Sequence, residues 1–309
     1  MGLSAGLLVY FVLKVDPAWA VATIRNADPF LLALAVGQLA LQVPLLAWRW
    51  YLITSSLGGE MPFGAALRYS WIGTFAGQIL PSVGGDAVRM WLYWTRQGSR
   101  RIAVYGVMLE RLIMVVALLA LVILSQSGLA ARGVPLTVLG TASLLLACIA
   151  AATAAIFFFA KDLLKESNFL PIRALRHAAE DLNRLRTDIS RTALALGLSF
   201  VAYLNMAIVM WIIGLGLNLG ASFIDCMVLT PLVVFAGMLP ISFGGWGVRE
   251  GAAILLFGLV GLSQAEAFAL SAVLGLCSVA VTLPGSVLWL VQERADEARR
   301  KQEDQSSNS

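Results

Sequence analysis

Long apolar segments, separated by short polar ones, occupy almost the whole chain. A helix needs about twenty apolar residues to cross the hydrocarbon core of a bilayer, and six segments approach or exceed that length. They lie near residues 2–15, 29–53, 103–125, 135–160, 191–213 and 265–291. These segments are continuously apolar over most of their length and lack the in-and-out alternation of a membrane β-strand. The pattern therefore predicts an all-α polytopic membrane protein with about six full spans.

Two further apolar regions, 63–95 and 223–262, are each interrupted in the middle by Pro and Gly-Gly. The two arms of each region are marginal in length for a full crossing. The predicted geometry is a helix, a break at membrane depth and a second helix, which together form a re-entrant hairpin. The alternative is a pair of ordinary spans joined by a tight turn, and both geometries return the chain to the same side.

The two interruptions are copies of one sequence. Residues 75–89 read FAGQILPSVGGDAVR and residues 235–249 read FAGMLPISFGGWGVR, with eight identities in fifteen positions. Three predicted crossings separate the copies, so the two hairpins should enter the membrane from opposite sides. This arrangement is an inverted-topology repeat with halves near 29–125 and 191–291, and such paired breaks point to the binding site of a transporter. The alternative is a structural duplication without transport.

The composition leaves little room for anything outside the membrane. The chain is 59% hydrophobic and 13% charged, and no polar stretch is long enough for a second folded domain. We therefore predict one transmembrane domain over residues 1–291. The polar tail over 292–309 is expected to lack regular structure beyond about residue 300.

Lysine and arginine are distributed unevenly between the two sides of the predicted spans. Threading the loops through the spans places sixteen cations on one side and three on the other. The sixteen lie in 96–101, 161–191 and 294–301, together with Arg49 and Arg68. Cytoplasmic loops carry the excess of positive charge, so this side and both termini are predicted to be cytoplasmic. The membrane is expected to be the inner membrane of a bacterial or archaeal cell.

Charged residues also fall inside the predicted membrane region, close to the two breaks. A charge at the bilayer centre costs about 2.5–3.5 kcal/mol on insertion scales, so these residues need an explanation. They are Asp86, Arg89, Glu110, Arg111, Arg249 and Glu250.

Arg89 and Arg249 end the two copies of the motif and are the leading candidates for binding an anion. The positive end of the helix after each break would assist them. The preceding glycines have no Cβ and would let the backbone approach a phosphate closely; they are Gly84, Gly85, Gly244 and Gly245. The remaining candidates would hold the arginines in place or contact the substrate or a coupling proton; they are Asp86, Glu110, Arg111, Glu250 and Trp246, which stands where Asp86 stands in the first copy.

A purely structural interpretation is also open for these residues. Asp86 and Arg89 are three residues apart on one helix face, and Glu110 or Glu250 could neutralise an arginine in the same way. The glycines could serve close helix packing.

Motifs for other chemistry are absent from the sequence. It has no Walker A sequence, no G-x-S-x-G and no H-E-x-x-H, and it has one histidine and three isolated cysteines. Transport driven by ATP within this chain is therefore excluded. We expect no enzyme activity, no cofactor, no bound metal and no nucleic-acid partner.

The stretches LPSVGGDAVR and LPISFGGWGVREG, with the pair Glu110-Arg111, resemble the lysylphosphatidylglycerol synthetase transmembrane-region family, also called the flippase-like domain family. The resemblance covers nearly the whole chain. It implies an integral membrane protein, and in bifunctional members a domain of this kind translocates an aminoacylated phospholipid between leaflets. The residues after Leu290 leave no room for an aminoacyl-transferase domain, so we do not expect this polypeptide to synthesise lysyl-lipid.

Taken with the resemblance, the sequence predicts a lipid translocase. Its substrate would be a phospholipid, an aminoacyl-phospholipid or a polyprenyl-phosphate lipid, moved by alternating access around the two breaks. The scarcity of Ser, Asn and Gln near the motifs favours a lipid over a polar solute. A carrier of small anions and a membrane partner of a glycan or lipid biosynthesis enzyme are the alternatives, and a homo-oligomer is compatible with each.

Overall fold

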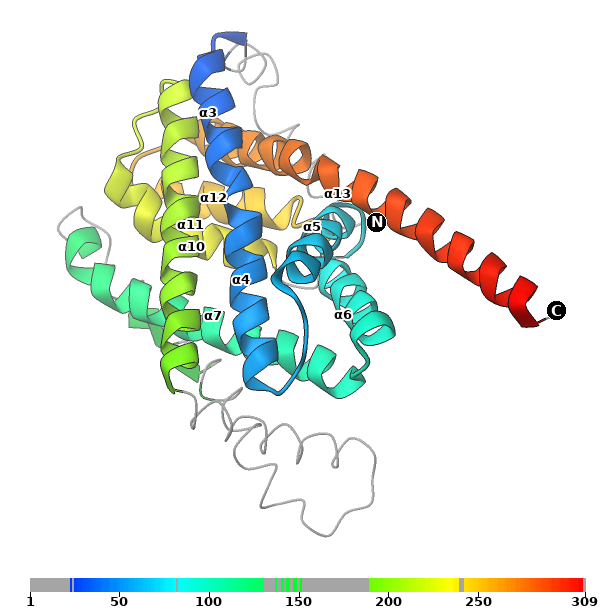
Figure 1. Cartoon of the computed structure of the whole chain (residues 1–309). Coiled ribbons are helices and arrows are strands. Elements are labelled where there is room, and N and C mark those ends of the chain that lie inside the picture. Colours follow the sequence, from blue (N-terminus) through cyan, green and yellow to red (C-terminus); the bar gives the residue numbers. More distant parts are fainter. Residues whose placement is uncertain are drawn as a thin grey trace.

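The computed structural model describes residues 25–81, 83–130, 189–238 and 242–307, together with Thr23 and single positions between 137 and 151. Within these ranges the regular elements are all α-helices (Figure 1). The predicted span near 2–15, nearly all of the one near 135–160 and most of the 161–191 loop lie outside the described residues.

The helices follow the predicted segments closely. In chain order they are α3 (Pro29–Ala40), α4 (Gln42–Ser56), α5 (Phe63–Ile79), α6 (Gly84–Gln97), α7 (Arg100–Ala130), α10 (Ile189–Gly216), α11 (Phe223–Gly237), α12 (Val248–Gly258) and α13 (Gln264–Ser307). Among the described residues, four helical stretches are long and apolar enough to cross a membrane: 29–56, 100–126, 190–216 and 264–294. They confirm four of the six predicted spans, and the prediction of an all-α polytopic membrane protein is confirmed with them.

The first span is interrupted at Leu41, between α3 and α4. Pro44 has no N–H with which to bond the carbonyl of Ala40, so the ladder of helical hydrogen bonds is broken at that point. At its start, Asp28 caps α3 by accepting from the backbone N–H of Phe30 at 2.8 Å.

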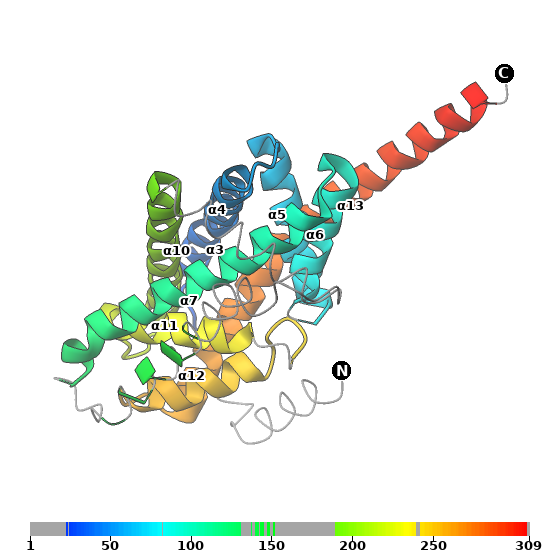
Figure 2. The same ribbon diagram turned by 90° about the horizontal axis from the view of Figure 1, so that it is seen from below.

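The two motif regions each form two helices with a break between them. In the first, α5 ends at Ile79 and α6 begins at Gly84. In the second, α11 ends at Gly237 and α12 begins at Val248. The two breaks touch, because Pro81 and Phe243 form an isolated antiparallel bridge. Figure 2 shows the loop of the cyan hairpin beside the loop of the yellow one.

Glycine packs the arms of both hairpins in the same way. A Cβ added to Gly77 would lie 3.7 Å from the Cα of Gly85, and one added to Gly237 would lie 3.7 Å from the Cα of Gly245. The offset of 160 residues therefore relates the same contact in both copies. Small residues at these points let the two helices approach closely.

The second break is longer than the first, because its glycines adopt conformations that other residues rarely take. Gly244, Gly245 and Gly247 have φ of 57°, 79° and 86°. Gly247 stands where the first copy has Ala87. At this position the second copy is still in the break, whereas the first copy is already in α6.

Helix α13 packs against α3, α5, α10 and α12. It continues to Ser307, so the prediction that the tail lacks regular structure beyond about residue 300 is wrong. The sequence places Asp296 four residues before Arg300 and Glu297 four residues before Lys301. This order of charges favours a helix even in a polar segment.

Candidate functional site

Glu110 on α7 joins two arginines from different helices. Its Oε1 accepts from Arg49 Nη2 on α4 at 2.8 Å, and its Oε2 accepts from Arg89 Nη2 on α6 at 2.5 Å. All three side chains are almost completely buried. A buried carboxylate shared by two guanidinium groups fixes three helices relative to one another, because an unpaired charge here would be costly.

Asp86 extends this network toward the surface of the site. Its Oδ1 accepts from Arg89 Nη2 at 2.9 Å, and its Oδ2 accepts from Arg111 Nε at 3.1 Å and, more closely, from Arg111 Nη2. The side chain of Arg111 is 36% exposed, against 4% for Arg89. The network therefore alternates Arg49, Glu110, Arg89, Asp86 and Arg111, and its three cations and two anions leave one positive charge.

The second copy of the motif forms a smaller pair. Arg249 Nη2 donates to Glu250 Oε1 at 2.7 Å, and Ser271 on α13 hydrogen-bonds both residues. The other carboxylate oxygen of Glu250 accepts from the backbone N–H of Gly247 at 2.6 Å. This pair is electrically neutral, so the excess positive charge of the site comes from the first network.

Both motif arginines also lie over an indole ring. The guanidinium carbon of Arg89 is 4.6 Å from the ring centroid of Trp50, and that of Arg249 is 4.8 Å from the ring of Trp246. A cation over a tryptophan face is attracted by the ring quadrupole. Gly275 on α13 makes room for this stack, because a Cβ there would overlap Arg249 and Trp246.

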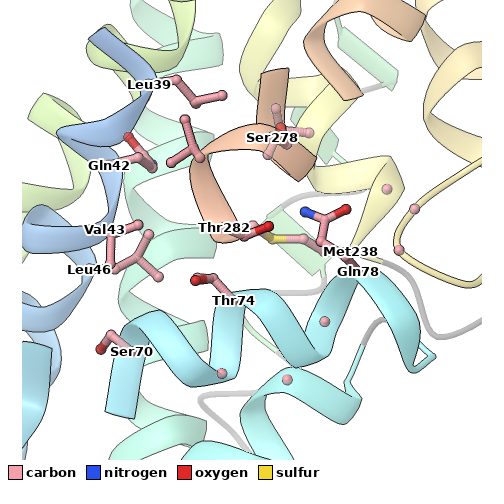
Figure 3. Close-up of a pocket in the computed structure, with 18 of the residues that line it drawn as sticks. Leu39, Gln42, Val43, Leu46, Ser70, Thr74, Gln78, Met238, Ser278 and Thr282 are labelled. Carbon is pink, nitrogen blue, oxygen red and sulfur yellow. The ribbon is translucent and has the colours of Figure 1, made fainter. Parts of the chain in front are cut away.

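A cavity of about 280 Å³ lies where the two hairpins meet. Asp86, Arg89, Arg111 and Arg249 line it, and they come from α6, α7 and α12. The volume is near the lower end of the range of about 300–1,000 Å³ that is usual for ligand pockets. The other walls come from α3, α4, α5, α10, α11 and α13 (Figure 3).

The structure divides the predicted site residues into two groups. Seven line the cavity: Gly85, Asp86, Arg89, Arg111, Gly244, Gly245 and Arg249. Four are not among its lining residues: Gly84, Glu110, Trp246 and Glu250. Of these four, Glu110, Glu250 and Trp246 contact the arginines, and Gly84 packs against Leu80.

Arg49 is the charged residue that the sequence reasoning misplaced. It was expected at the cytoplasmic edge, but it is only 2% exposed and is bound to Glu110. The available signal was its position between Trp48 and Trp50 within an apolar segment, where a loop residue is not expected.

The cavity is also more polar than the sequence reasoning assumed. Six uncharged polar side chains line it: Gln42, Ser70, Thr74, Gln78, Ser278 and Thr282. Their spacing gave the signal, since 70, 74 and 78, like 278 and 282, are four residues apart and share one helix face. The scarcity of Ser, Asn and Gln around the motifs therefore says little about this site.

The fold and the site define a multi-pass helical membrane protein with a cavity lined by arginines between two broken hairpins. Residues 1–285 match the family described as Lysylphosphatidylglycerol synthase TM region, so the chain belongs to that family. No curated protein matches the chain. Membership confirms the resemblance found in the sequence and indicates a lipid-related membrane protein.

Proposed function

We propose that this protein is a lipid translocase that moves an anionic lipid between the two leaflets of the membrane. The observation that carries the proposal is the cavity in which Arg89 and Arg111 from one half of the chain face the same space as Arg249 from the other. Family membership supports a lipid-related role. No reaction is part of the proposal, which is transport without catalysis.

The charge of the site suits a phosphate group. The described residues around the cavity carry one positive charge more than they neutralise. Guanidinium groups bind phosphate through two parallel hydrogen bonds. Arg111 is the most exposed of the three arginines and would meet the phosphate first. Glu110 and Glu250 hold Arg89 and Arg249 in place. These two arginines, one from each hairpin, would then bind the same phosphate.

The other walls of the cavity suit the lipid tail. Leu39, Val43 and Leu46 line one side, and Val234 and Leu274 line another. An apolar surface next to a phosphate-binding group can accept the first methylenes of an acyl or polyprenyl chain while the headgroup stays with the arginines.

The repeat gives the proposed mechanism. The two hairpins would belong to halves of opposite topology. Movement at their contact, between Pro81 and Phe243, would make the site accessible alternately from one leaflet and from the other. In this mechanism the hairpins are re-entrant and the breaks lie near mid-depth, where a site can be reached from either side.

A carrier of small anions is the second candidate, and one observation favours it. The six uncharged polar side chains of the cavity would also suit a soluble phosphate ester. The two candidates differ in what crosses the membrane, so one experiment separates them.

The test is leaflet exchange in vesicles that contain the purified protein. A fluorescent phosphatidylglycerol should exchange between leaflets at least about tenfold faster than in protein-free vesicles. Uptake of glycerol 3-phosphate is measured in parallel. Uptake without lipid exchange would show that the protein is a carrier of small anions and not a lipid translocase. If neither activity is measured, both candidate functions are contradicted.

We further propose that both termini face the cytoplasm of a bacterial or archaeal cell. The predicted loops on that side, with the C-terminal tail, carry most of the lysine and arginine. A reporter cysteine at Gln97 or at Gln305, in a chain without its own cysteines, should resist a membrane-impermeant thiol reagent added to intact cells. The same position should react after the cells are opened. Labelling in intact cells would reverse the orientation.

A further inference from the structure

The polar side chains of the cavity form stripes on helices that face each other. Ser70, Thr74 and Gln78 follow one face of α5, and Ser278 and Thr282 follow one face of α13. The two helices are in contact, since the indole N–H of Trp71 on α5 donates to the carbonyl of Val281 on α13 at 3.1 Å. Figure 3 shows Thr74, Gln78 and Thr282 around the same space.

The hydroxyl groups of these stripes present acceptors to the cavity. Thr74 donates its hydroxyl hydrogen to the carbonyl of Trp71 at 2.9 Å, and Ser278 and Thr282 donate to helix carbonyls at 2.8 and 3.0 Å. A hydroxyl that has donated its one hydrogen can only accept from a ligand.

Two further polar atoms at the cavity have no partner in the part of the chain that the structure describes. They are the hydroxyl of Ser70, whose residue is 1% exposed, and the side-chain oxygen of Gln78. Buried polar groups in proteins are almost always hydrogen-bonded. The hydroxyl oxygens of Thr74, Ser278 and Thr282, which have already donated to helix carbonyls, therefore suit a partner that supplies hydrogen-bond donors.

The charge of the site decides which kind of donor this is. In the described residues, Asp86, Glu110 and Glu250 each already bind an arginine, and the network keeps one positive charge. An ammonium group would meet that charge without a free carboxylate to balance it. A neutral hydroxyl supplies the same donors without the repulsion.

We propose that the headgroup is an uncharged polyol, such as glycerol or a sugar, joined to the lipid through a single phosphate. The arginines bind the phosphate, and the stripes on α5 and α13 accept from the hydroxyl groups. This inference rests on the proposed function and narrows it, because it excludes an aminoacylated headgroup with its ammonium charge. The site is therefore suited to a different headgroup from the one in the family's description.

The experiment compares three lipids with identical acyl chains and the same fluorescent label in the proteoliposome assay. Phosphatidylglycerol carries one negative charge and two hydroxyls, phosphatidylethanol carries the same charge without hydroxyls, and phosphatidylethanolamine carries an ammonium group. Phosphatidylglycerol should exchange about tenfold faster than either of the others, as expected for one or two hydrogen bonds.

Thr74→Val with Thr282→Val removes two acceptors at nearly constant volume. This double variant should exchange phosphatidylglycerol about as slowly as phosphatidylethanol, while the rate for phosphatidylethanol stays the same. The matched control is Thr95→Val on α6, where an exposed threonine makes the same type of bond to its own helix, to Trp91 at 2.8 Å. That variant should behave as the unmodified protein does.

Each failure has its own meaning. Equal rates for phosphatidylglycerol and phosphatidylethanol would overturn the polyol headgroup but leave the translocase intact. Fastest exchange of phosphatidylethanolamine would overturn the argument from charge. Exchange of no lipid at all would contradict the proposed function, and the headgroup inference would fall with it.

Discussion

Glu110→Ala is expected to destabilise the protein more than the removal of any other carboxylate around the cavity. Glu110 is the shared partner of Arg49 and Arg89, and all three are buried. Breaking a buried ion pair by removing one partner costs about 3–5 kcal/mol, because the other charge is left uncompensated. Here two guanidinium groups lose a partner, and only Arg89 keeps a second carboxylate, that of Asp86.

The measurement is the apparent melting temperature of the purified protein in detergent, together with its yield. Glu293→Ala on α13 is the control, since Glu293 is exposed and accepts a hydrogen bond from the indole N–H of Trp289 at 2.8 Å. The triple variant Arg49→Met, Glu110→Met and Asp86→Asn removes both carboxylates that bind Arg89. Its melting temperature should also be low. The double variant Arg49→Met and Glu110→Met, which keeps Asp86, should recover part of the lost melting temperature. Equal melting temperatures for Glu110→Ala and Glu293→Ala would show that the network does not hold the fold.

Arg249→Ala and Arg89→Ala are expected to have the largest effect on transport. Each removes a guanidinium group that faces the cavity, and truncating one partner of a buried charged contact costs about 2–5 kcal/mol, or roughly 30-fold or more in rate. Lysine keeps the charge but not the planar fork, so Arg89→Lys should lose less than Arg89→Ala without reaching the unmodified rate.

The two roles of Arg89 are separable because its carboxylates have other partners. Without Arg89, Glu110 keeps Arg49 and Asp86 keeps Arg111. A binding role predicts that Arg89→Ala folds but exchanges lipid slowly. A structural role alone predicts a loss of stability that Asp86→Ala shares and that the double variant recovers. Arg68→Ala is the control for both measurements, since Arg68 is exposed on α5 and does not line the cavity.

The sequence predicted the helices well, because membrane spans are set by long apolar runs. Four of the predicted spans coincide with helices of the structure, and the break in each motif falls where Pro and Gly-Gly interrupt the run. The difference in length between the breaks was not predictable from the shared glycines. It goes with the positive φ of Gly244, Gly245 and Gly247, of which Gly247 has no glycine counterpart in the first copy.

The partners of the charged residues were predicted only in part. The pairs Asp86–Arg89 and Arg249–Glu250 are local in the sequence, so the spacing was sufficient to suggest them. The contact of Glu110 with Arg49 joins residues 61 positions apart, and it depends on how α4 packs against α7. Such a contact has no local signature, which is why the sequence places Arg49 at the edge of the membrane and does not pair it with Glu110.

We expect that the two breaks must move relative to each other for a lipid to pass. Pro81 and Phe243 are bridge partners, and residues opposite each other in an antiparallel pair have Cα atoms about 4.5–5.5 Å apart, within reach of a disulfide. The test protein carries Pro81→Cys and Phe243→Cys in a chain from which Cys148, Cys226 and Cys277 have been removed. The corresponding single-cysteine chains are the controls.

The measurement is the rate of phosphatidylglycerol exchange in proteoliposomes before and after oxidation, and again after reduction. Oxidation should lower the rate of the double-cysteine protein to that of protein-free vesicles, and reduction should restore it, with no change in the single-cysteine controls. Exchange that continues at the unmodified rate in the fully cross-linked protein would show that a lipid passes without relative movement of the two breaks.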